Sequence, residues 1–273
     1  MNKFVPKPAS LKRFNITAQL SDIKNTHKVL VEKETKMKAT PGIKRAFVIV
    51  ALFMMFQQIT GINIPFYYGP TVIANLHIFG STSGTYLSNA VFGIEASSIL
   101  AIINVLATLI GFRLIDSYGR RSLGLLGYAG MAFFDILGTV LYLSHIEIGL
   151  LIGFAGFIVF FAFGVGGTGW LIQGEYFPTQ YRGLYASLIA VVDWISNFAI
   201  IELFPVMHID IGLGYTMAVF GILSIMAVIT FYFIMPETKN KSVEEITDMF
   251  EKNQLKDVKN AAESGKSPNA GNK

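Results

Sequence analysis

The sequence predicts an all-α polytopic membrane protein with six transmembrane helices, and two observations support this prediction. Apolar residues make up 52% of the 273 residues and charged residues only 15%, whereas soluble domains carry about 25% charged residues. The 22 Lys and Arg residues also leave three long gaps, each of which can hold at least one span of about 20 residues. Those gaps are residues 46–112, 122–181 and 183–238.

The apolar segments predict six spans along the chain. The first segment is too long for one straight crossing and contains Gly61 and Pro65, so we expect a broken or kinked helix there. An even number of spans places both ends of the chain on the same side of the membrane. The predicted spans are residues 46–76, 88–115, 123–143, 149–173, 183–206 and 213–235.

The basic residues predict the orientation of these spans. The connections near 77–87, 144–148 and 207–212 contain no Lys or Arg. Because positively charged connections stay in the cytoplasm, we expect a multi-pass protein of the cell membrane with both termini cytoplasmic. All 22 Lys and Arg residues fall in the segments predicted to be cytoplasmic: 11 in 1–45, three in 113–121, one at Arg182 and seven in 236–273.

The chain divides into three predicted regions. Apolar residues recur at helical spacing over residues 16–30, which indicates an amphipathic helix outside the bilayer. Ser242 and Glu245 form a capping-box pattern and predict a short helix after the last span, followed by disorder from about residue 254. The regions are a cytoplasmic amphipathic linker region (1–45), a six-helix transmembrane bundle (46–235) and a cytoplasmic tail (236–273).

Several function classes have no supporting pattern. The chain has no cysteine, which excludes disulfides, thiol catalysis and thiolate metal sites. The spans contain no paired acids, Ser-His-Asp set or metal-ligand spacing, so we expect no catalytic residues, no enzyme, no cofactor and no metal. Gly164, Gly166 and Gly169 match a dinucleotide-binding pattern, but they lie in an apolar span, where close helix packing is the better interpretation. The basic residues follow the membrane boundary, so no nucleic-acid partner is expected.

Polar residues inside the spans are the candidates for a ligand site, because lipid penalises them unless they face a cavity or a partner. Gln57, Gln58 and Asn63 surround the expected break in the first span, and Asp193 and Trp194 lie within one arc of the fifth. Amides both donate and accept hydrogen bonds, which suits the hydroxyls of a sugar or polyol, and an indole suits the C–H face of a sugar. Hydrogen bonding between helices is the alternative interpretation.

Several motifs follow one another between residues 57 and 242. They are QQITGINIPFYY at 57–68, Asn104 before DSYGRR at 116–121, GWLIQGEYFPTQYRG at 169–183, Trp194, and PETKNKS at 236–242. Each is weak by itself, but together and in this order they resemble the sugar porter family of the major facilitator superfamily. Members have twelve helices, and this chain resembles the C-terminal six-helix half together with the linker before it.

The resemblance implies roles for particular residues. For the charged residues at the cytoplasmic ends of the spans, the alternative to the role given below is anchoring and solvation at the membrane surface. Substrate contacts are implied at Gln57, Gln58, Asn63, Asn104 and Trp170, with Trp194 close by and Asp193 beside it. A cytoplasmic gate of ion pairs, closed while the site faces outward, is implied at Asp116, Arg120, Arg121, Glu175, Arg182 and Glu237.

We therefore expect secondary transport of a sugar or related polyol by alternating access, with this chain supplying the C-terminal helix bundle and much of the sugar site. Two alternatives remain: a non-transporting sugar-responsive sensor or subunit, and a truncated gene product that is inactive alone. Alternating access needs two bundles around a central site, and the cavity-facing polar residues of one bundle would be open to lipid. Besides the lipid bilayer, we expect a partner that is an N-terminal six-helix half or a second copy.

Overall fold

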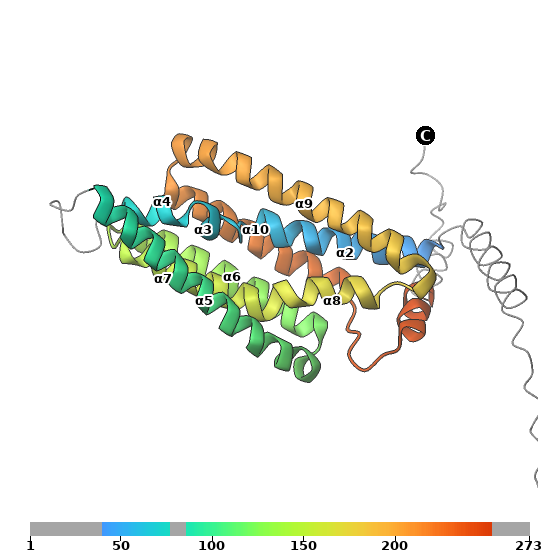
Figure 1. The fold of residues 1–273 in the computed structure, drawn as a ribbon. Helices are drawn as coiled ribbons and strands as arrows, with labels where there is room; N and C mark the ends of the chain where they lie inside the picture. Colours follow the sequence, from blue (N-terminus) through green and yellow to red (C-terminus); the bar gives the residue numbers. More distant parts are fainter. Residues whose placement is uncertain (1–39, 77–85, 253–273) are drawn as a thin grey trace, which may run out of the picture. The chain divides into compact units, whose positions relative to one another are not determined.

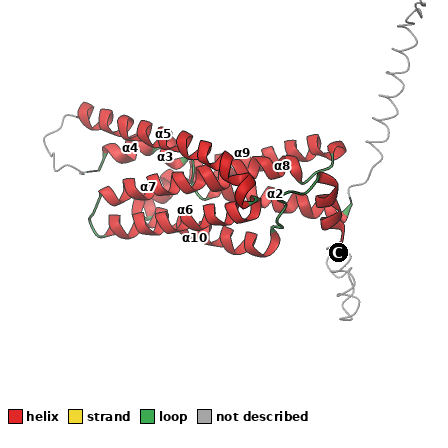
Figure 2. Cartoon of the chain, turned by 90° about the horizontal axis from the view of Figure 1, so that it is seen from below, coloured by secondary structure: helices red, strands yellow, loops and turns green. Residues whose placement is uncertain are grey.

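The computed structural model describes residues 40–76 and 86–252, and within them all regular structure is helical (Figure 2). The amphipathic helix expected at residues 16–30 and the disorder expected beyond residue 254 lie outside the described residues. The predicted all-α class and the six spans are confirmed in the described part of the chain. The six stretches that are long and apolar enough to cross a membrane are Pro41–Tyr67, Asn89–Tyr118, Arg120–Leu143, Ile148–Glu175, Thr179–Asp210 and Leu213–Ile234.

The first span is broken, and α4 follows it directly. Gly61 lies in the break at φ +90°, a backbone conformation that glycine adopts far more readily than other residues. A Cβ at this position would also lie 2.9 Å from the ring of Phe220. Pro65, which has no N–H to donate, occupies an early position of the helix after the break, where no donor is needed. The predicted break is therefore confirmed. The elements are α2 (Pro41–Ile59), α3 (Ile64–Tyr67) and α4 (Gly69–Ala74).

The middle spans pack closely through glycines. A Cβ at Gly164 would lie 2.5 Å from the Cα atom of Gly127, so the third and fourth spans approach each other at backbone distance. This contact supports helix packing as the role of the glycines in the fourth span. The second and third spans are α5 (Tyr86–Tyr118) and α6 (Arg120–Leu143), and the fourth comprises α7 (Ile148–Phe160), the wider helical turn η1 (Phe161–Gly166) and α8 (Gly167–Glu175).

The last two spans are α9 (Thr179–Asp210) and α10 (Leu213–Ile234). α9 lies along α2, and α10 packs against α6 (Figure 1). The rings of Phe53, Tyr128 and Phe231 join α2, α6 and α10, with centroids 5.0 to 5.6 Å apart. The buried Tyr128 hydroxyl donates to the Phe53 carbonyl oxygen at 3.0 Å, so it is satisfied. Large apolar side chains stay exposed along α5 and α9, as expected for surfaces that face lipid.

A further helix follows α10 over residues 243–252. The N–H of Ser242 donates to the Glu245 carboxylate at 2.7 Å, and the N–H of Glu245 donates to the Ser242 hydroxyl at 3.3 Å. This reciprocal pair is the predicted capping box. Ile246 and Phe250 are buried, and the Phe250 ring lies 5.2 Å from the Tyr176 ring, so the helix packs against the end of the fourth span.

Candidate functional site

Four polar side chains join the break in the first span to α9. The Gln58 amide nitrogen donates to Asp193 Oδ1 at 2.8 Å. The Asn63 amide nitrogen lies 2.9 Å from Gln58 Oε1 and 2.7 Å from Asn197 Oδ1, and it donates to both. We call these four residues the polar network. The sequence predicted three of its members as site residues, and the structure brings those three together.

The helical geometry of α9 explains why the polar network forms. Asp193 and Asn197 are four residues apart, so they lie on the same face of the helix, one turn from each other. That face packs against α2, and Gln58, Asp193 and Asn197 are all buried there. Polar groups withdrawn from water are costly unless they find partners. Here the amides and the carboxylate provide partners for one another within the chain.

Gln57 is buried beside the polar network but is incompletely satisfied. Its Oε1 atom has no hydrogen-bond partner among the described residues. A Cβ at Gly169 would lie 2.6 Å from that atom, so the amide presses against α8 one residue before Trp170. A buried acceptor without a donor costs about 1–3 kcal/mol. The Gln57 oxygen is therefore a buried acceptor that no donor among the described residues satisfies.

The expected exposure to lipid is wrong for two of the predicted site residues. Both are buried inside the chain, because Gln57 packs against α8 and Asp193 packs against α2. The indole rings behave differently: Trp170 is 49% exposed and Trp194 is 62% exposed. Asn104 is half-buried on α5 and takes no part in the polar network that the described residues form. The structure therefore gathers the amides and leaves the aromatic faces open.

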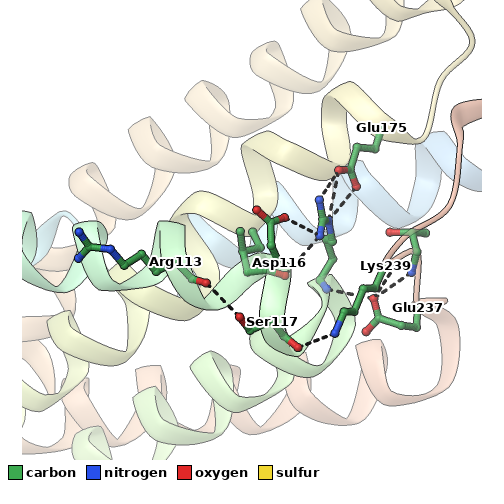
Figure 3. A network of polar contacts seen from close by, with 9 residues as sticks. Arg113, Asp116, Ser117, Glu175, Glu237 and Lys239 are labelled. Carbon is green, nitrogen blue, oxygen red and sulfur yellow. Dashed lines mark hydrogen bonds and ion pairs between the residues drawn. The ribbon is translucent and has the colours of Figure 1, made fainter.

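A second polar cluster lies where α5 meets α6, at the opposite end of these spans from the α6–α7 connection. Arg120 Nη2 donates to Glu175 Oε1 at 2.8 Å, and Arg120 Nε lies 3.1 and 3.2 Å from the two Glu175 oxygens (Figure 3). Arg120 Nη1 also contacts Asp116 Oδ1 at 3.2 Å. The Arg120 side chain is 13% exposed, that of Glu175 is 23% exposed and that of Asp116 is 78% exposed. The partly buried Arg120–Glu175 pair is thus the stronger of the two.

Glu237 connects this charged end to the segment after α10 by capping α6. Its carboxylate accepts hydrogen bonds from the backbone N–H of Arg120 at 3.0 Å and of Ser122 at 3.4 Å. A negative charge is favourable at the N-terminus of a helix, where backbone N–H groups lack partners. Gly119, at φ +91°, makes room for it, since a Cβ there would lie 2.6 Å from Glu237 Oε2. Sequence reasoning included Glu237 in the gate but missed this capping role.

The remaining charged residues of the predicted gate lie outside this connected set. Arg121 Nη2 donates to the Tyr232 carbonyl oxygen at 2.6 Å, and its guanidinium lies 5.5 Å from the centre of the Tyr232 ring. Arg182 Nε donates to the Phe177 carbonyl oxygen at 3.3 Å. The structure therefore joins Asp116, Arg120, Glu175 and Glu237, and it leaves Arg121 and Arg182 on separate local contacts.

Lys239 belongs to the charged end although the sequence did not single it out. Its ammonium group donates to the carbonyl oxygen of Ser117 at 2.6 Å, which joins the segment after α10 to the last turn of α5 (Figure 3). The position of Lys239 within the PETKNKS motif, two residues after Glu237, is the sequence signal that could have pointed to it.

This six-helix arrangement, with one broken span and a charged cluster at one end, defines a multi-pass membrane protein of the major facilitator type. Residues 9–250 match the sugar (and other) transporter family, and the chain belongs to that family. A solved structure of the major facilitator superfamily proton:xylose symporter, bound to 6-bromo-6-deoxy-D-glucose, aligns with a TM-score of 0.65 and 25% identity. The alignment covers 75% of this chain and 42% of that one.

Two relatives extend the comparison. The chain is 33% identical over 234 residues to the arabinose-proton symporter of Bacillus subtilis. The aligned residues cover 85% of this chain and 48% of the symporter. It is 31% identical over 215 residues to monosaccharide-sensing protein 1 of Arabidopsis thaliana, which covers 77% of this chain and 29% of that relative. The chain thus spans about half the length, or less, of these curated relatives.

Proposed function

We propose that this chain is the C-terminal half of a secondary transporter that moves a sugar or related polyol by alternating access, and that it supplies much of the sugar site. The observation that carries the proposal is the polar network at the break in the first span. Its amides bond each other across two helices in the middle of an apolar bundle. Membership in the sugar (and other) transporter family supports the same reading.

The polar network can exchange its own hydrogen bonds for bonds to sugar hydroxyls. Each amide both donates and accepts, and each hydroxyl does the same, so the number of satisfied groups is kept when a sugar replaces an interhelical contact. The unpaired oxygen of Gln57 gains a donor in this exchange. The exposed rings of Trp170 and Trp194 offer flat apolar faces for the C–H side of the sugar. Asn104, half-buried on α5, is a further candidate contact for the sugar.

The charged end provides the gate. While the site faces outward, the Arg120–Glu175 pair holds α6 against α8, and Glu237 ties the segment after α10 to α6. Opening the site at this end requires those contacts to part, and water then solvates the separated charges. Arg121 and Arg182 anchor neighbouring segments at the same end. Anchoring at the membrane surface is the competing role for the whole cluster, and isolated exposed pairs contribute only about 0–1 kcal/mol.

The location and the partner follow from the same reasoning. The basic residues favour a cell-membrane protein with the charged end and both termini cytoplasmic. Rocking about a central site needs a second bundle, and the chain spans about half the length of the arabinose-proton symporter. The partner is therefore an N-terminal six-helix half or a second copy of this chain. The exposed indoles of Trp170 and Trp194 belong to the surface that this partner would cover.

A sugar-responsive sensor is the second candidate, favoured by the similarity to monosaccharide-sensing protein 1. Uptake of radiolabelled arabinose and xylose separates the two functions. It is measured in cells that make the chain alone, or together with the N-terminal half of the arabinose-proton symporter. Saturable uptake with either arrangement, abolished by Gln58→Ala, supports a transporter. Sugar binding without uptake in both arrangements contradicts the transporter and favours the sensor.

A further inference from the structure

Asp135 lies deep in α6, and one of its oxygens has no partner. The side chain is 2% exposed, and Oδ2 has no hydrogen-bond partner among the described residues. At 1.5 Å per residue, Asp135 lies about 22 Å along α6 from Arg120. A lone acid in an apolar helix forms no pattern, and for that reason the sequence did not single it out.

Asp135 faces a small cavity at the break in the first span. The wall includes Thr60 and Gly61 of the break and Phe220 of α10. The remaining wall residues are apolar side chains of α3, α7, α9 and α10. The free volume for the centre of a water molecule is about 10 Å³, which is room for about one water molecule. The carboxyl group can therefore form a hydrogen bond with at most one water molecule in this cavity.

No cation among the described residues balances a charge on Asp135. The only other polar side chain in the cavity wall, Thr60, donates to the Phe56 carbonyl oxygen at 2.9 Å and has no further proton to offer. Several ionisable residues lie on the surrounding elements, but none of them lines the cavity. They include Lys44 and Arg45 of α2, Tyr67 of α3, Glu95, Arg113, Asp116 and Tyr118 of α5, Arg120, Arg121, Tyr128 and Tyr142 of α6, Tyr181, Arg182, Tyr185, Asp193, Glu202, His208 and Asp210 of α9, and Tyr215 and Tyr232 of α10.

These surroundings favour the neutral acid. An isolated carboxylate without donors or a cation is so costly in an apolar setting that the group takes up a proton instead. Losing that proton requires more water than the cavity holds. The break and Phe220 close one side of the cavity, because the space between Gly61 and that ring does not admit even a Cβ, so moving the break away from Phe220 would admit more water.

We propose that Asp135 is a proton-binding site, separate from the polar network. It holds a proton while the break is packed against Phe220, and it releases the proton when the break opens and water enters the cavity. Asn63 lies two residues after Gly61 and donates to both Gln58 and Asn197, so opening the break also rearranges the polar network. Protonation and opening can both be measured without sugar or a second bundle, so this site stands apart from the proposed transport function.

Infrared difference spectra test the protonation. The purified chain in phosphatidylcholine nanodiscs is compared at neutral and alkaline pH, and the parent should lose the C=O band of a protonated carboxyl group as the pH rises. Asp135→Asn should lack this component, and Asp193→Asn should retain it. Asp135→Glu, which keeps a carboxyl group, should move the band. A band of parental size in Asp135→Asn, or an unmoved band in Asp135→Glu if the Asn variant does not fold, would overturn the proposal.

Cysteine labelling tests the link to opening. The chain has no native cysteine, so Thr60→Cys places a single thiol in the cavity wall. Below the thiol pKa, the rate of labelling rises about tenfold per pH unit because more thiolate forms. If the break opens only when Asp135 has lost its proton, the rate rises by about another tenfold per pH unit. A plot of the logarithm of the labelling rate against pH should therefore have a slope near two for Thr60→Cys alone and a slope near one for Thr60→Cys combined with Asp135→Asn. Equal slopes in the two backgrounds would overturn the link between the proton and the break.

Discussion

The polar network and the charged end both hold helices together, but they use different chemistry. In the polar network, neutral amides bond one another and one carboxyl group within buried contacts between α2 and α9. At the charged end, a guanidinium joins two carboxyl groups, and Asp116 is largely in water. The difference follows from position, because an unpaired charge is tolerated at the membrane surface and is costly inside the bundle.

This contrast separates two mechanical roles. Contacts between neutral groups can be exchanged for sugar hydroxyls at little cost, which suits a binding site. Ion pairs at a water-exposed end can be broken and solvated, which suits a gate. The break at Gly61 belongs to the first role, because movement of that segment shifts the polar network and leaves intact the helices that carry the charged end.

The largest effect is expected when the break itself is changed. Gly61→Ala forces a side chain into a left-handed conformation and brings its Cβ 2.9 Å from the Phe220 ring. The two costs together predict a loss of about 2–5 kcal/mol of stability, measured as thermal unfolding in nanodiscs. Gly212→Ala is the control, because Gly212 also has a positive φ, +81°, but nothing lies within 4 Å of its Cβ position. Equal losses in the two variants would contradict a specific role for the Phe220 contact.

A smaller effect is expected at the charged end. Arg120→Ala removes the partner of the partly buried Glu175, which predicts a loss of about 2–3 kcal/mol, between the limits for exposed and buried pairs. The loss should shrink as salt is raised, because salt screens the ion pair in the parent. Asp116→Ala, at a largely exposed position, should change the stability by less than about 1 kcal/mol. Thermal unfolding at low and high salt measures both, and an Arg120→Ala loss as small as that of Asp116→Ala would show that the cluster only anchors.

The smallest of the three effects is expected in the polar network. Asn63→Ala removes one donor shared by Gln58 and Asn197, which predicts a loss of about 1–2 kcal/mol. In contrast to Arg120→Ala, this loss should not depend on salt, because no ion pair is involved. The same unfolding measurement checks it, and a loss that shrinks with salt would remove the distinction between the two regions.

Local features were predictable from the sequence, and contacts between distant segments were not. The break at Gly61 and the capping box at Ser242 and Glu245 depend on residues within a few positions of each other, so their patterns are visible in the sequence. Which span lies next to which is not encoded locally. The bond between Gln58 and Asp193 joins residues 135 positions apart.

Burial was the main error of sequence reasoning. Polar residues in the spans were expected to line an open cavity, but Gln57 is covered by α8 and Asp193 by α2. Asp135 was missed for a different reason: a single acid without polar neighbours in the sequence gives no periodic signal. The capping of α6 by Glu237 was also out of reach, because it depends on how the segment after α10 returns to the α5–α6 turn.

Sugar binding followed by tryptophan fluorescence tests the central proposal most directly. The chain contains two Trp residues, Trp170 and Trp194, and both belong to the proposed site. The nanodisc-reconstituted chain, alone or with the N-terminal half of the arabinose-proton symporter, is titrated with arabinose, xylose and glucose. We predict a saturable change whose affinity falls about 5- to 150-fold in Asn63→Ala, the equivalent of about 1–3 kcal/mol. Gln173→Ala, which removes a buried amide bonded to the Ala186 carbonyl oxygen outside the polar network, should bind as the parent does. No saturable change with any of these sugars, or equal affinity in Asn63→Ala and the parent, would contradict a sugar site at the break.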